Sequence, residues 1–155
     1  MELRSAILWI HAGAAAAWVA ASVCFIVAGL ALVAGSEEQR NFAMRAASKI
    51  DAFNLAAALT LLFTGAANFA VAGVLRGFHF SGQFELILGV KVILFVGMSI
   101  ALGRALRTAA SLRVSHDSPS ADTIANTTTR MMLAHGAIVA MGGVALLLGL
   151  WLMGT

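Results

Sequence analysis

The chain has 155 residues, of which 61% are hydrophobic and only 11% are charged, and its formal net charge is +3. A soluble domain of this length carries about 25% charged residues, so the composition excludes an ordinary soluble protein and predicts a membrane protein. Cys24 is the single cysteine, so an internal disulfide is excluded, and nothing in the charge pattern suggests a nucleic-acid partner.

Four long apolar runs predict transmembrane helices at about 5–35, 52–75, 86–106 and 131–153. Each run has roughly the 20 residues that a helix needs to cross a hydrocarbon core of about 30 Å. Only helices and closed barrels satisfy their backbone polar groups in lipid, and these runs lack the alternation of barrel strands. We therefore predict an all-α integral membrane protein, with residues 1–155 forming one antiparallel four-helix domain.

The first apolar run carries a histidine, His11, within LWIHAGAAAAWV. The run is much longer than the roughly 7–15 residues of a signal-peptide core, so we expect the helix to be retained. At about 100° per residue, His11 shares a helical stripe with Trp18. An ionisable residue inside a membrane span indicates a functional site by default, and the alternative is a packed interfacial histidine.

The second and third runs add polar residues that we expect at the depth of His11. Asn68 lies near the end of the second run, and Lys91 lies near the start of the third. In the predicted bundle these three residues form one layer about 8–10 Å below the outer surface. The layer is the candidate site, although Asn68 alone is typical of interhelical hydrogen bonding and Lys91 of an anchor that reaches the interface.

The connection between these two runs, LRGFHFSGQFE, contributes further candidates. It places Arg76, His79 and Glu85 just outside the layer. Arg76 is a candidate partner for an anionic group, and His79 is a candidate metal ligand with Glu85 beside it.

The fourth run carries His135 and follows a connection that we expect to be a long cytoplasmic loop over 107–130. His116 lies in this loop, where a solvated side chain is expected. By depth, His135 lies roughly 15 Å from His11 in a core of about 30 Å. Because two ligands of one metal must each approach it to about 2 Å, His135 belongs to a second metal site or is structural.

Basic residues are distributed unequally between the predicted connections. The side that carries more of them has seven, namely Arg40, Arg45, Lys49, Arg104, Arg107, Arg113 and Arg130, against Arg4 and Arg76 on the other. The positive-inside rule therefore predicts that both termini lie on the non-cytoplasmic side.

Several segments together resemble the copper-resistance D type of membrane protein. They are LWIHAGAAAAWVAAS, LTLLFTGAANF, LILGVKVILFVGMSIALGRALR and TTRMMLAHGAIVAMGGVALLLGLWL. The pattern is also distantly similar to the four-helix membrane protoporphyrinogen oxidases, which bind a b-type haem through a histidine of the first helix. That resemblance implies the bacterial cytoplasmic (inner) membrane as the location, and it matches His11 and Lys91 to the family's histidine and lysine.

Three hypotheses follow for the function. The first is a haem b redox protein in which His11 ligates iron, Lys91 or Arg76 pairs with propionates, and Asn68 and Trp18 line the site. The second is a copper-handling or copper-uptake protein with a copper ion held by His11, His79 and Glu85, although only Cys24, Met98 and Met141 lie between His11 and His135. The third is a non-catalytic membrane subunit or scaffold. The expected partners are the lipid bilayer, a redox partner or quinone, and further subunits in a homo-oligomer or membrane complex.

Overall fold

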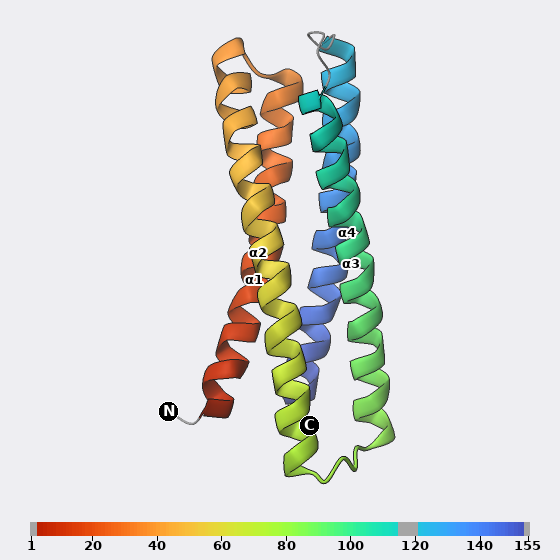
Figure 1. Cartoon of the computed structure of the whole chain (residues 1–155). Helices are drawn as coiled ribbons and strands as arrows, with labels where there is room; N and C mark the ends of the chain where they lie inside the picture. The colour runs from red at the N-terminus through yellow and green to blue at the C-terminus, as the bar shows by residue number, and fades with distance from the viewer. Residues whose placement is uncertain (1–2, 115–120, 154–155) are drawn as a thin grey trace.

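A computed structural model describes residues 3–114 and 121–153, and this part of the chain is entirely helical apart from short turns. The four helices are α1 (Leu3–Ala34), α2 (Glu37–Leu75), α3 (Gly82–Val114) and α4 (Ala121–Met153). Figure 1 shows them side by side along one axis, with the two termini and the α2–α3 turn at one end. We call this the termini end, and we call the opposite end, which carries the α1–α2 turn, the distal end.

All four helices contain segments that are long and apolar enough to cross a membrane. Those segments are Leu3–Ala34, Arg45–Leu75, Gly82–Ala110 and Asp122–Gly149. Each keeps only a minor share of its residues buried inside the protein, so most of its surface is apolar and outward-facing. The prediction of four membrane-spanning helices agrees with this finding.

The helices are longer than the apolar runs that predicted them. Helix α2 begins at Glu37 instead of residue 52, and α3 continues to Val114. The prediction of a long loop over 107–130 was wrong, because residues 107–114 belong to α3 and residues 121–130 belong to α4. Hydropathy detects only the part of a helix that lies in lipid, whereas the Ala-, Arg- and Thr-containing extensions can stay helical in water, and Asp122 favours the start of α4. His116 lies outside the described residues.

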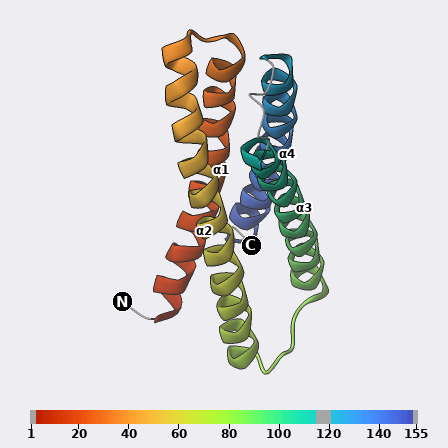
Figure 2. The same cartoon turned by 45° about the horizontal axis from the view of Figure 1, so that its top comes forward.

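Helix α1 packs against α2 and α4, and α3 packs against α4, whereas α2 and α3 hardly touch. Figure 2 shows the same arrangement from another direction, with α1 beside α2 and α3 beside α4. Small residues allow the close approaches. A Cβ on Gly142 of α4 would lie 2.6 Å from Val19 Cγ2, and one on Gly29 of α1 would lie 2.6 Å from Met132 Cγ. These contacts fix the levels at which residues of different helices meet.

The turn between α2 and α3 closes the second helix with a Schellman motif. Phe78 N–H donates to the Gly73 carbonyl over 2.8 Å, and Gly77 N–H donates to Val74 over 3.4 Å. Gly77 has a φ of 56°, which glycine adopts without strain. The Phe78 ring lies on Gly73, where a Cβ would come within 2.4 Å of it. This turn holds the loop residues at the termini end.

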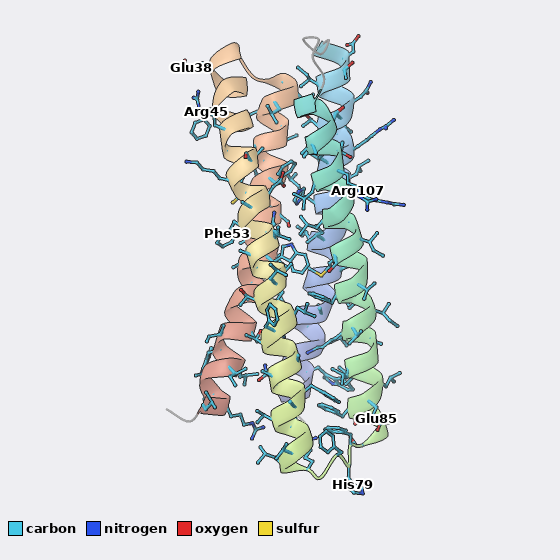
Figure 3. The ribbon with its side chains drawn as sticks, viewed as in Figure 1. Glu38, Arg45, Phe53, His79, Glu85 and Arg107 are labelled. Carbon is cyan, nitrogen blue, oxygen red and sulfur yellow. The ribbon has the colours of Figure 1, made fainter. Side chains whose placement is uncertain are left out.

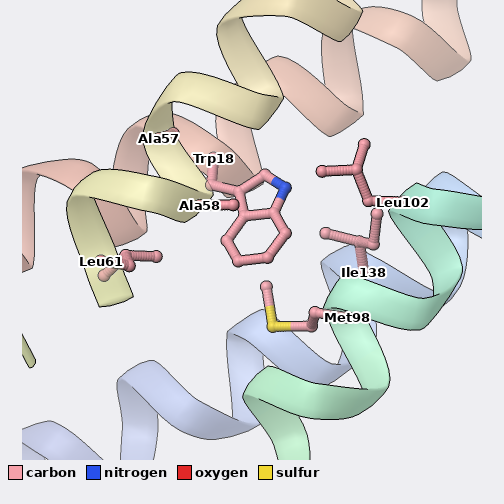
Figure 4. Packing of buried hydrophobic residues seen from close by; sticks show 7 residues of the cluster. All are labelled: Trp18, Ala57, Ala58, Leu61, Met98, Leu102 and Ile138. Atoms are coloured by element: carbon pink, nitrogen blue, oxygen red, sulfur yellow. The ribbon is translucent and has the colours of Figure 1, made fainter. Parts of the chain in front are cut away.

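A buried hydrophobic cluster, seen from close by in Figure 4, forms the core of the bundle. Trp18 is fully buried there and meets Phe95 edge-on at 5.9 Å between ring centroids. The cluster joins side chains of all four helices: Trp18, Ala57, Ala58, Leu61, Met98, Leu102 and Ile138. It therefore divides the interior of the bundle into a part toward the termini end and a part toward the distal end.

Candidate functional site

His11 faces α2 and is fixed by one hydrogen bond. Its Nδ1 lies 2.9 Å from Thr64 Oγ1. The Thr64 hydroxyl donates its own hydrogen to the Thr60 carbonyl, 2.6 Å away, so its oxygen accepts from His11. We therefore assign the hydrogen of His11 to Nδ1, which leaves a lone pair on Nε2. Gly65 makes room for the ring, since a Cβ there would lie 3.3 Å from His11 Cε1.

Lys91 reaches from α3 to α4 at the level of His11. Its Nζ lies 3.2 Å from the position of a Cβ on Gly149, so the ammonium group rests against the backbone of α4. Val19 meets Gly142, and both His11 and Gly149 lie about two helical turns from that contact, toward the termini end. His11 and Lys91 are also close enough to interact electrostatically. The two residues thus lie in one layer of the bundle.

Lys91 has no carboxylate partner among the residues with described side chains, where the one recorded ion pair is elsewhere. The side chain is only partly exposed. Its ammonium lies in the last turns of α4, where the carbonyl ends of a helix favour a cation. A half-buried ammonium group without an anion is a suitable partner for an anionic ligand.

Asn68 is not the hydrogen-bond partner of His11. That partner is Thr64, one helical turn before Asn68, because His11 packs at the level of Thr64 and Gly65. The sequence feature that could have identified this partner is the threonine-glycine pair in LTLLFTGAANF. The pair places a hydroxyl group beside a residue without a side chain, and Thr64 lies on the same helix face as Asn68.

The loop candidates lie farther out. Arg76 lies over the Phe84 ring at 5.4 Å from its centroid, and Phe84 stacks on Phe80. His79 and Glu85 are exposed at the termini end, as Figure 3 shows. Helix α2 runs for about 16 Å between Thr64 and its end at Leu75. His79 and Glu85 therefore do not meet His11, and Arg76 is engaged with an aromatic ring.

His135 lies in a different environment from His11. It is fully buried, and its ring stacks on Phe25 with centroids 4.0 Å apart. Its Nε2 lies 3.6 Å from Asp51 Oδ1 of α2. No role was predicted for Asp51, which immediately precedes the predicted second run at about 52–75.

The three histidines proposed as metal ligands do not form a common site. Phe25, the neighbour of His135, lies fourteen residues beyond His11 on α1, which is about 21 Å along the helix. His79 is separated from His11 by the end of α2. Throughout residues 3–114 and 121–153, no group of three or more His, Cys, Asp or Glu side chains could hold a metal ion. The structure therefore does not bring His11, His79 and Glu85 together.

Trp18, expected to line the cofactor site, lies instead in the hydrophobic cluster. It is about two helical turns from His11, so its side chain packs between the two histidine-containing regions.

Comparison of the chain with family models, curated proteins and solved structures gave no match.

Proposed function

We propose that this protein is an integral membrane redox protein that binds a b-type haem between its helices at the level of His11 and Lys91. The observation that carries the proposal is the hydrogen bond between His11 Nδ1 and Thr64 Oγ1 over 2.9 Å, because the tautomer assigned from it leaves the lone pair of Nε2 for a metal. A histidine held in one tautomer by its other nitrogen is the usual arrangement of a metal-binding imidazole. Bound haem would supply one-electron transfer.

The other residues at the level of His11 also fit a bound haem. Lys91 offers its unpaired ammonium to a propionate, and Gly65 and Gly149 keep the faces of α2 and α4 free of side chains near the two groups. The planar group needs room between the helices. The weak α2–α3 contact is where the fold can provide it, since the two helices are not locked together there.

We further propose an antiparallel bundle in a bacterial cytoplasmic membrane, with the termini end on the non-cytoplasmic side. The excess of basic residues at the distal end supports this orientation, and Figure 3 shows Arg45 near that end. A reporter that is active only in the cytoplasm, fused to either terminus, should be silent. Strong activity of such a fusion would reverse the orientation and place His11 near the cytoplasm.

The absorption spectrum of the purified protein tests the haem proposal. We expect a Soret band together with α and β bands that sharpen on reduction, and we expect them to disappear in His11→Ala. The matched control is His79→Ala, because it removes an exposed histidine of the α2–α3 turn and should leave the spectrum unchanged.

Three results would contradict the proposal. A colourless preparation that carries copper would favour a copper-handling protein, and one that carries neither haem nor metal would favour a structural subunit. A normal haem spectrum in His11→Ala would show that His11 is only a packed residue.

A further inference from the structure

The pair of Asp51 and His135 is a second polar centre that the proposed function does not use. The two side chains come from α2 and α4, and 3.6 Å separates Asp51 Oδ1 from His135 Nε2. The exposed fraction is 0% for the His135 side chain and 7% for that of Asp51. Both residues lie within segments that can cross a membrane, so the pair is placed in an apolar environment.

The pair belongs to a set of buried side-chain polar atoms that have no hydrogen-bond partner among the described residues. They are Trp18 Nε1, Ser22 Oγ, Asp51 Oδ1, both side-chain polar atoms of Asn54, and both ring nitrogens of His135. Buried polar groups are normally paired, so such a concentration on three neighbouring helices indicates a site and not a packing detail. These atoms have almost no accessible surface, which leaves little room beside them for a larger ligand.

The charge of the pair identifies what it binds. A lone carboxylate or imidazolium is costly in an apolar interior, whereas the two together are neutral overall when they share one added proton. No other titratable side chain is fully buried among those described: the remaining buried polar residues are Ser22, Asn54 and Thr128. Lys49 of α2 and Arg104 and Arg107 of α3 are exposed, and α1 contributes Phe25, whose ring stacks on His135. Among the side chains that the structure describes, none other than that of His135 is buried with a charge that could balance Asp51, so a proton is the charge that suits the pair.

We propose that Asp51 and His135 form an intramembrane proton-binding site that holds one proton between Asp51 Oδ1 and His135 Nε2. The proton comes from hydronium in the adjoining water, which is left as a neutral water molecule. Its movement from the nitrogen to the oxygen breaks one N–H bond and forms one O–H bond, without oxidation or reduction. Proton-carrying carboxylate and histidine side chains are a common use of ionisable residues in membrane spans.

Asp51 is the member of the pair that reaches the protein surface. Its side chain keeps an exposed fraction of 7%, whereas that of His135 has none. Toward the termini end, the cluster that contains Trp18, Leu61 and Met98 (Figure 4) lies between the level of the pair and that of His11. We therefore expect a proton to exchange through Asp51.

Magnetic resonance of the full chain in lipid nanodiscs counts the proton directly. With ¹⁵N-labelled histidine and ¹³C-labelled aspartate, the ring shows whether one or both nitrogens carry hydrogen, and the carboxyl shows whether it is ionised. At neutral pH we expect one proton on the pair, either as imidazolium with carboxylate or as imidazole with carboxylic acid. The signal of His135 is identified by its loss in His135→Gln.

Asp51→Asn should leave His135 neutral, because the counter-charge is gone, while Asp122→Asn should not change it. Asp122 is an exposed acidic residue at the start of α4, so this control removes the same charge at a distance. An ionised Asp51 beside a neutral His135 in the unmodified protein would overturn the proposal, even if Asp51→Asn fails to fold. If the unmodified pair carries its proton as imidazolium, an equal response to both substitutions would overturn it as well.

Discussion

The regions around His11 and His135 differ in how deeply the histidine is buried and in which groups its ring nitrogens meet. His11 is half-buried, has one nitrogen satisfied by Thr64, and keeps the other available beside the unpaired Lys91. His135 is fully buried, stacks on Phe25 and faces a carboxylate. The first arrangement suits a ligand that enters between helices, and the second suits a proton. The same residue type thus suits two different chemistries because its neighbours differ in charge and burial.

Removing half of the interior pair should have the largest effect on stability. Asp51→Ala leaves His135 without its carboxylate and opens a cavity, and we expect the free energy of unfolding to fall by about 3–5 kcal/mol. The double substitution Asp51→Asn with His135→Gln should be clearly more stable than Asp51→Ala, because it leaves no unbalanced charge. Reversible unfolding in mixed micelles measures both.

A substitution at His135 should not affect cofactor binding at the level of His11. We expect His135→Ala to retain the spectrum of a bound haem, with lower thermal stability, because about 21 Å along α1 separates the two levels. Complete loss of the cofactor from a folded His135→Ala protein would show that the two regions form one site.

A change in the α1–α4 packing between the two regions should lower the free energy of unfolding less than the loss of Asp51 does. In Gly142→Ala the added Cβ would lie 2.6 Å from Val19 Cγ2, the end of a short, stiff side chain that cannot move away easily. We expect a loss of about 1–3 kcal/mol in the free energy of unfolding. Gly143→Ala is the control, since nothing lies within 4 Å of its Cβ, and the better helix propensity of alanine should leave stability equal or slightly higher. Similar losses in both variants would contradict the assigned α1–α4 contact.

Much of the fold followed from hydropathy, but the partners of the site residues did not. Apolar runs predicted the four spans, and counting residues from their ends placed His11 and Lys91 in one layer, because helical rise is constant. Periodicity could not tell that Thr64, and not Asn68, meets His11, since both lie on one face of α2 a single turn apart. Asp51 was missed for another reason. Its pairing with His135 depends on how α2 and α4 are aligned, which no local pattern contains.

Loss of the hydrogen bond between Thr64 and His11 should have the smallest effect on stability, and its effect on haem binding is the most diagnostic. Thr64→Val keeps the shape of the side chain but leaves His11 Nδ1 without an acceptor, and we expect a loss of about 0.5–1.5 kcal/mol in stability. If His11 ligates iron, the same change should weaken haem binding by roughly 10–100-fold and shift its reduction potential, because the imidazole is no longer held in one tautomer. Thr64→Ser keeps the hydroxyl and should restore both quantities. Redox titration of the two variants separates orientation from packing, since a purely structural threonine would change stability while leaving the potential of the bound haem where it was.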